Sequence, residues 1–90
     1  MPALNTTTLE EVESVVIETT AHVLQMPDVE RTDNFFDLGV DSLVAARILT
    51  ELRNRLGVDV PLVQVFETPD IDEFCESLLD LLAEAETDQT

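Results

Sequence analysis

Basic residues and glycine are scarce in this 90-residue chain, and each shortage excludes a class of protein. Four Lys and Arg side chains oppose 20 Asp and Glu, which gives a formal net charge of -16 at pH 7. A chain this acidic repels phosphate backbones and anionic lipids, so we expect no nucleic acid or membrane partner. With two glycines and 44% hydrophobic residues, it is too apolar for a disordered acidic tail. We expect a folded domain that favours basic protein partners.

Cysteine and long apolar runs are missing as well, apart from the single Cys75. One cysteine cannot form an internal disulfide, so we expect a reducing compartment, the cytoplasm, and a small hydrophobic role for Cys75 in the core. Residues 1–8 lack the basic start and the apolar stretch of a signal peptide. No apolar run approaches membrane-spanning length.

The length of the chain sets an upper bound on its architecture. Ninety residues hold one hydrophobic core, so we expect a single domain over 1–90 with flexible ends at about 1–7 and 84–90. A core this small leaves little room for an enclosed catalytic cleft, which argues against a complete enzyme. The start at Met1 favours a discrete protein, which we expect to be a monomer, although a domain cut from a larger synthase would have a similar sequence.

Hydrophobic spacing predicts an all-α fold, a four-helix bundle of three main helices and one short helix. The side chains of Thr8 and Glu11 have the spacing of a capping box, which begins a first helix that ends near Leu24. The second main helix is expected over 42–56, because Gly57 is well placed to end it in the left-handed conformation.

The second half of the chain predicts one short and one long helix. Pro61 at a first helical position and Pro69 as a stop leave room for a short helix over 62–66. Asp70 with Glu73 then opens the last helix. The residues of the main helices expected to face the core are Leu9, Val12, Val16, Val23, Ala45, Leu49, Leu52, Leu56, Ile71, Phe74, Leu78 and Leu81 or Leu82.

A long loop over 25–41 precedes the second helix and includes Phe35 and Phe36, which could pin it to the core. Loops of this length in compact domains are usually functional. Ser42 follows at the first position of the helix, where free amides and the helix dipole stabilise a negative charge by about 0.3 to 1 kcal/mol. A phosphodiester built on Ser42 would be accommodated there. The alternative is a serine that only caps the helix.

The stretch from Asp33 to Leu43, DNFFDLGVDSL, resembles the phosphopantetheine-attachment signature of acyl and peptidyl carrier proteins. The next stretch, VAARILTELRNRLGVDVPLVQVFETPDI, continues the similarity. The resemblance implies that Ser42 receives 4'-phosphopantetheine from coenzyme A through a separate transferase. The thiol of this arm would then hold an acyl, aminoacyl or peptidyl group as a thioester. The chain would be a non-catalytic carrier in polyketide or nonribosomal peptide biosynthesis.

The same resemblance implies which enzymes the carrier meets. They are a phosphopantetheinyl transferase, an acyltransferase or adenylation enzyme, and a ketosynthase or condensation enzyme. Asp41 matches an acidic position that helps to engage the transferase and its magnesium ion, although a helix cap is an equally good interpretation. The residues expected to contact partners are Asp41, Leu43, Val44, Arg47, Val63 and Phe66.

Three of the four basic residues, Arg47, Arg53 and Arg55, fall in the expected second helix, where Glu51 alone opposes them. This departs from fatty-acid carriers, whose equivalent helix is typically acidic, and is similar to the peptidyl carriers of nonribosomal peptide and hybrid synthesis. Acidic residues are concentrated in the first and last helices instead. Alternatively, the arginines pair locally with acidic side chains, and the four-residue spacing of Glu51 and Arg55 supports this.

Other interpretations of the polar residues meet specific obstacles. A serine hydrolase needs an oriented base, but the chain offers only His22 and lacks the glycine that follows the nucleophile in an elbow turn. Asp33, Asp37 and Asp41 lack the spacing of a calcium loop, and no Cys and His cluster suggests zinc, so we expect no metal site. The remaining alternative is an unmodified acidic helical adaptor that binds a basic protein and uses Ser42 only as a cap.

Overall fold

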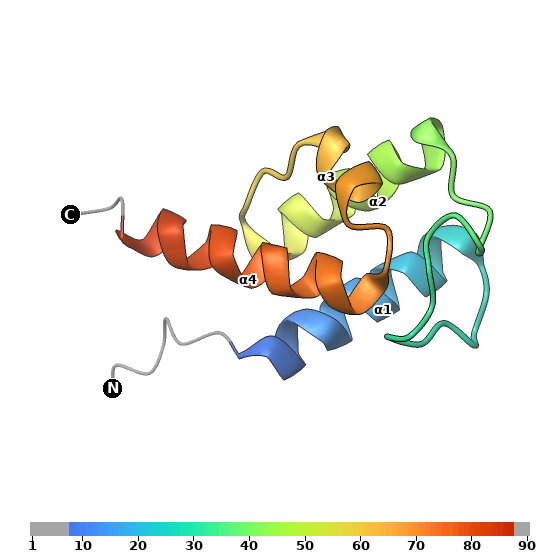
Figure 1. Cartoon of the computed structure of the whole chain (residues 1–90), viewed down its shortest axis with the longest axis horizontal. Helices are drawn as coiled ribbons and strands as arrows, with labels where there is room; N and C mark the ends of the chain where they lie inside the picture. The colour runs from blue at the N-terminus through green and yellow to red at the C-terminus, as the bar shows by residue number, and fades with distance from the viewer. Residues whose placement is uncertain (1–7, 88–90) are drawn as a thin grey trace.

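Four helices joined by loops make up the computed structural model, which describes residues 8–87. The helices are α1 (Leu9–Leu24), α2 (Ser42–Leu56), α3 (Leu62–Glu67) and α4 (Ile71–Thr87), and no strand lies in the described range. α1 packs against both α2 and α4, α4 runs antiparallel to α1, and α3 packs on α2 (Figure 1). The predicted all-α fold with three main helices and one short helix is confirmed.

The start of α1 and the end of α2 follow from local sequence signals. The Thr8 hydroxyl accepts a hydrogen bond from the Glu11 amide at 3.2 Å, and the Glu11 carboxylate accepts one from the Thr8 amide at 3.0 Å. This is the predicted capping box. At the end of α2, Gly57 adopts a φ of +73° and donates its amide to the Arg53 carbonyl at 2.8 Å. The left-handed conformation costs glycine little free energy, so the helix ends where predicted.

The boundaries of α3 and α4 differ in detail from the prediction. Pro61 has φ -64° and ψ 144°, which is extended rather than helical, so it precedes α3 instead of forming its first residue. α4 begins at Ile71 as expected, but the side chain of Asp70 does not bond to Glu73. The Glu73 amide donates to Asp72 Oδ1 at 2.8 Å, and Asp70 instead accepts a hydrogen bond from Asn34.

The expected flexible ends lie mostly outside the described residues. Residues 1–7 and 88–90 are not described. Residues 84–87, where the expected C-terminal end starts, form the last turn of α4. Within 8–87, none of the helices combines the length and the apolarity that a bilayer crossing requires.

One hydrophobic core lies between the helices and the long loop. Of the residues predicted to face it, Val12, Val16, Ala45, Leu49, Leu52, Ile71, Phe74 and Leu78 are buried, and Leu9, Val23, Leu56, Leu81 and Leu82 are partly buried against it. The prediction missed Ile48, which is also fully buried. Burying such a side chain stabilises the fold by about 1.5 to 3 kcal/mol.

Cys75 is a buried core residue, as predicted. Removal from water raises the pKa of its thiol to about 12, and the nearby carboxylates of Glu13, Asp72 and Glu76 add to the shift because they repel a thiolate. The thiol therefore stays protonated and packs as a small hydrophobic group.

Candidate functional site

Ser42 is the first residue of α2, and its hydroxyl does not cap the helix. The cap is Asp41, whose Oδ1 accepts a hydrogen bond from the Val44 amide at 2.9 Å. Ser42 is exposed, and its hydroxyl makes no hydrogen bond to any other described residue. Of the two capping residues left open by the sequence, the structure selects Asp41 and leaves the Ser42 oxygen accessible.

A tight turn delivers the chain to Ser42. The amides of Leu38 and Val40 both donate to the Phe35 carbonyl, at 3.1 and 3.0 Å. Gly39 lies between them with a φ of +88°, and the added Cβ of another residue would meet no atom within 4 Å. A side chain at Gly39 is therefore opposed by backbone strain alone. Val40 is buried, so it fixes the end of the loop in the core one residue before the cap.

Asn34 straps the same loop to the junction of α3 and α4, a contact that the sequence analysis missed. Its side-chain amide donates to Asp70 Oδ1 at 2.9 Å, and its side-chain carbonyl accepts from the Phe36 amide at 2.8 Å. The backbone joins the same two segments, because the Phe35 amide donates to the Pro69 carbonyl at 2.8 Å. The loop that presents Ser42 is therefore held by a segment more than 30 residues later in the chain.

The two phenylalanines of the loop have different surroundings. Phe35 is fully buried, and its ring meets that of Phe74 edge to face with centroids 5.1 Å apart. Phe36 is 46% exposed and stacks on Phe66 of α3 with centroids 5.6 Å apart. The sequence analysis expected that both rings could pin the loop to the core, and the structure bears this out for Phe35 but not for Phe36. Phe36 connects the loop to α3 at the surface.

The structure distributes the expected partner-contact residues over α2 and α3. Leu43 is 73% exposed, as the sequence analysis favoured, and Arg47 is exposed one turn later. Both line a hollow of about 270 Å³ with Ala46, Thr50 and Glu51. On α3, Val63 is 54% and Phe66 40% exposed. Val44 is only partly exposed and packs against the core, so it offers less surface than the others.

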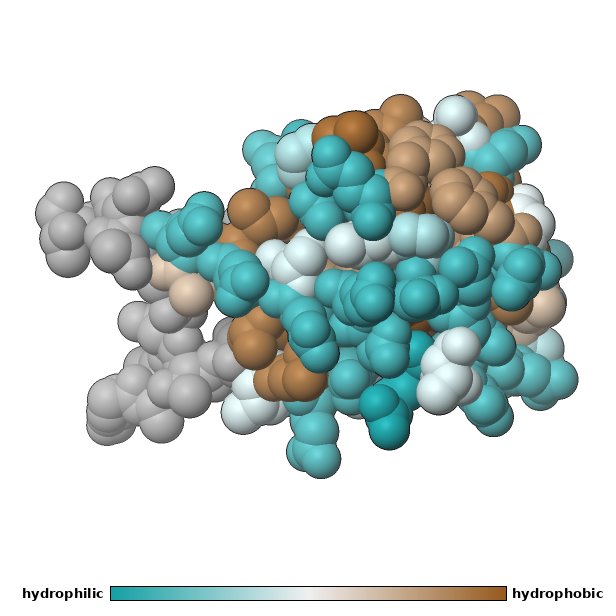
Figure 2. Space-filling view, viewed as in Figure 1, coloured by the Kyte–Doolittle hydropathy of each residue, from teal (hydrophilic) through white to brown (hydrophobic). Residues whose placement is uncertain are grey.

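We call Phe36, Leu43, Arg47, Val63 and Phe66 the arm face. Figure 2 shows hydrophobic surface over α3 and the neighbouring start of α2, while hydrophilic side chains cover most of α4. Large exposed apolar groups gathered in one region are typical of interaction surfaces. On the face shown in Figure 2, apolar surface thus lies beside the helix that Ser42 begins.

Two of the three arginines of α2 pair with acidic side chains, as the alternative proposed, but Arg55 does not pair with Glu51. Arg53 Nη1 lies 3.5 Å from Asp59 Oδ1, and Arg55 Nη1 lies 3.8 Å from Glu18 Oε1 of α1. The prediction that Arg55 pairs with Glu51 is wrong, because its guanidinium contacts Glu18 of the neighbouring helix α1 instead. Within residues 8–87, Arg47 forms no ion pair.

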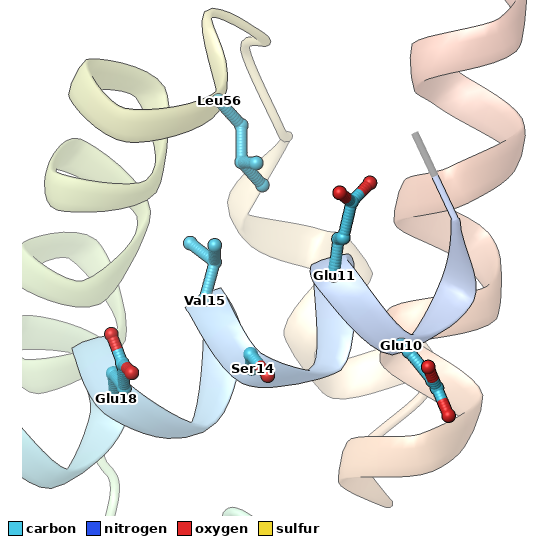
Figure 3. A pocket seen from close by; sticks show the side chains of 6 residues that line it. All are labelled: Glu10, Glu11, Ser14, Val15, Glu18 and Leu56. Atoms are coloured by element: carbon cyan, nitrogen blue, oxygen red, sulfur yellow. The ribbon is translucent and has the colours of Figure 1, made fainter. Parts of the chain in front are cut away.

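A second hollow lies at the other end of α2, and the sequence analysis did not foresee it. It has a volume of about 600 Å³ and is lined by Glu10, Glu11, Ser14, Val15, Glu18 and Leu56. We call it the acidic hollow. In Figure 3, Val15 and Glu11 extend from α1 towards Leu56 of α2. Ser42 and Leu56 are the first and last residues of α2, about 20 Å apart along the helix axis.

The described side chains do not form the serine–histidine pair or the calcium loop considered as alternatives. His22 is exposed in the last turn of α1, and no hydrogen bond between described residues joins it to Ser42. Asp33, Asp37 and Asp41 do not converge, since no group of three metal-ligating side chains is found within 8–87. Asp33 Oδ2 accepts from the Glu30 amide at 2.8 Å, so this carboxylate stabilises the loop.

The site fits a phosphodiester-linked group. The Ser42 oxygen is exposed and unbonded, the first turn of α2 contains no acidic residue, and the N-terminus of a helix stabilises an anion. Asp41 is the one carboxylate adjacent in sequence, and it is turned to the Val44 amide. Ser42 would carry the group, and the first amides of α2 would face its phosphate.

Sequence comparison finds similarity to short segments of peptide synthases. A linear gramicidin synthase of Brevibacillus parabrevis is 40% identical over 73 residues, which cover 81% of this chain. Beauvericin nonribosomal cyclodepsipeptide synthetase of Beauveria bassiana is 41% identical over 68 residues, or 76% of the chain. This chain spans only about 1% to 2% of the length of these relatives.

The family model described as the phosphopantetheine attachment site matches residues 14–78, and this range contains Ser42, the loop before it and the start of α4. The prosthetic group of this family is 4'-phosphopantetheine. The resemblance seen in the sequence is confirmed, and the chain belongs to the family of phosphopantetheine-bearing carrier domains.

Proposed function

We propose that this protein is a carrier in nonribosomal peptide biosynthesis, or in a hybrid polyketide line, with its 4'-phosphopantetheine arm on Ser42. One observation carries the proposal: the Ser42 hydroxyl is exposed at the start of α2, and Asp41 performs the capping that would otherwise occupy it. The arm supplies a thiol that holds the cargo as a thioester. The names of the relatives, which are synthases of peptides, support the choice of pathway.

The chemistry of loading needs little from this chain beyond Ser42. Its oxygen loses a proton to the transferase and forms a bond to the phosphorus of coenzyme A that carries pantetheine. The bond from that phosphorus to the adenosine bisphosphate breaks, and adenosine bisphosphate leaves. The hydrogen bond of Asp41 to the Val44 amide stabilises the backbone at the helix start, so Ser42 is presented at a fixed place in the chain. We also assign to Asp41 a contact with the transferase and its magnesium ion.

The carrier itself is not an enzyme in this proposal. It acts as a substrate for the transferase, for an adenylation enzyme or acyltransferase, and for a condensation enzyme or ketosynthase. Its contacts with them are made by Asp41, Leu43, Val44, Arg47, Val63 and Phe66. It works as a monomeric domain in the cytoplasm, without a nucleic acid or membrane partner.

The acidic hollow is the one feature that favours the adaptor as a second candidate function. Carboxylates around an apolar floor of Val15 and Leu56 suit a basic protein segment. The hollow lies at the end of α2 remote from Ser42, so the adaptor function needs no modification of the serine. Loading of Ser42 distinguishes the two functions.

The test is incubation with coenzyme A, magnesium and a broad-specificity phosphopantetheinyl transferase, followed by intact-protein mass spectrometry. We expect the mass to increase by one phosphopantetheine in the wild type and not at all in Ser42→Ala. Ser14→Ala is a matched control, because Ser14 is also an exposed helical serine, and it should load like the wild type. A wild-type protein that stays unmodified with several active transferases would favour the adaptor.

A further inference from the structure

Arg47 differs from the other two arginines of α2 in having no acidic partner. Arg53 and Arg55 lie within 4 Å of Asp59 and Glu18, whereas the guanidinium of Arg47 has no ion pair or hydrogen bond within the described part of the chain. Glu51 lies one turn further and lines the same hollow, but it does not pair with Arg47 either. The guanidinium of Arg47 therefore keeps all of its donors available.

Apart from the carboxylate of Glu51, the side chains that line the hollow with Arg47 are apolar or already hydrogen-bonded. Leu43 lies one turn before Arg47, and Ala46 precedes it directly in sequence; these two form the apolar part of the hollow of about 270 Å³. The Thr50 hydroxyl donates to the Ala46 carbonyl at 3.0 Å, so it is turned back onto the helix. Arg47 is thus an unpaired cation beside an exposed leucine, on the helix that starts at Ser42.

The charge around the arm face contrasts with that of the rest of the molecule. The acidic residues of α1 are all Glu and those of α4 are Asp and Glu, and neither helix contains Lys or Arg, whereas α2 contains three arginines and one glutamate. The overall charge of -16 opposes a phosphate-rich partner such as nucleic acid or an anionic membrane. A protein carboxylate suits this position, because the planar guanidinium binds it through two parallel hydrogen bonds.

We infer that the enzyme that acylates the arm docks on this face with an apolar recess for Leu43 and an Asp or Glu carboxylate opposite Arg47. This inference rests on the proposed carrier function. The partner surface then needs different charges in two places. Basic groups at its rim suit the acidic α1 and α4, but a basic group at the docking centre is repelled by Arg47.

The test uses the intact protein, loaded with phosphopantetheine, and an adenylation enzyme of nonribosomal peptide synthesis with ATP and its amino acid, chosen from a panel because it acylates the wild type. The acylated fraction is followed by intact mass. We expect Arg47→Glu to lower kcat/KM by at least about tenfold, mainly through KM, and added salt to reduce the difference. Arg47→Lys should retain more activity than Arg47→Gln.

Arg53→Glu is the matched control. Arg53 is exposed on the same helix, about 120° around its axis from Arg47, and its ion pair with Asp59 is surface-exposed. We expect its kcat/KM to stay within about twofold of the wild type, because a charge away from the docking centre contributes little. Substituting Arg for the facing Asp or Glu of the enzyme should restore acylation of Arg47→Glu.

The outcomes separate this inference from the carrier function. If Ser42 accepts the arm but Arg47→Glu is acylated as fast as the wild type, the inference is wrong and the carrier function stands. The same holds if Arg47→Glu and Arg53→Glu are impaired equally. If Ser42 does not accept the arm at all, the carrier function itself fails.

Discussion

The arm face and the acidic hollow lie at opposite ends of α2 and share one core, yet they present different chemistry. At the Ser42 end the exposed groups are Leu43, Phe36 and the α3 side chains, with Arg47 unpaired among them. At the Leu56 end the exposed groups are carboxylates of α1, and one of them, Glu18, neutralises Arg55.

The contrast shows that a net charge of -16 does not describe the surface that a partner meets. The long-range field attracts basic partners, because it sums over all charges. The contact itself depends on a few groups at the centre of the interface. In our proposal the central groups include the exposed Leu43 and the unpaired Arg47, so the acidity of the chain would govern approach and the arm face would govern fit.

The largest effect that we predict concerns the reactivity of Cys75, which is buried in the core near the carboxylates of α1 and α4. Its pKa of about 12, against an ordinary value of 9.0, lowers the thiolate fraction at pH 8 by about a thousandfold. Alkylation of the unmodified native protein by iodoacetamide should be slower by at least that factor than in guanidinium. Because the unfolded thiol ionises first, stability should fall as the pH rises from about 9 to 12.

The arm thiol gives the Cys75 experiment its internal control. Protein loaded with phosphopantetheine should react at one thiol per molecule under native conditions, and Ser42→Ala at none. Native alkylation of Cys75 within tenfold of the unfolded rate would contradict the burial described here.

The core shared by both surfaces is tested by two leucines of α2. Leu49 is buried and Leu43 is exposed, so Leu49→Ala should lower the free energy of unfolding by about 2 to 5 kcal/mol. Leu43→Ala should change it by less than about 0.5 kcal/mol. Urea titrations followed by circular dichroism measure both, and equal losses would show that the two faces of α2 are assigned incorrectly.

The hydrogen bond between Asn34 and Asp70 should have an intermediate effect on the free energy of unfolding. Asn34→Asp removes the donor that faces Asp70 and places a carboxylate against it, which should cost about 1 to 3 kcal/mol of unfolding free energy. Asn54→Asp makes the same chemical change at an exposed position of α2 without a side-chain hydrogen bond and should cost less than about 0.5 kcal/mol. Thermal melts of the two variants that coincide would exclude this hydrogen bond as a stabilising contact.

The smallest effect is expected at the acidic end of α2. Arg55 and Glu18 are 3.8 Å apart, and both side chains are exposed to water. Arg55→Gln should therefore change the unfolding free energy by less than about 1 kcal/mol. A larger loss, measured by the same urea titration, would mean that the ion pair contributes to the packing of α1 on α2.

Local signals in the sequence predicted most of the fold. The capping box of Thr8 and Glu11, the bounds of α2 and its end at Gly57 depend on residues within a few positions of each other. The position of Ser42 at the start of a helix follows from the same signals. Its free hydroxyl does not, because Asp41 and Ser42 are both good capping residues and only the structure distinguishes them.

Contacts between distant segments could not be predicted. The hydrogen bond of Asn34 to Asp70 spans 36 positions, and the stacking of Phe36 on Phe66 spans 30. Arg55 illustrates the same limit, since helical spacing offered Glu51 and the packing of α1 supplied Glu18. Each of these pairs depends on how two elements lie against each other, which the periodicity of either element alone does not contain.

The most direct test of the central claim is the mass of the protein purified from its natural host, followed by fragmentation that locates any modification. We predict a phosphopantetheine on Ser42, in part of the sample extended by an acyl, aminoacyl or peptidyl group that hydroxylamine removes. A host-purified protein with an unmodified Ser42, or with the arm on a different serine, would contradict the account.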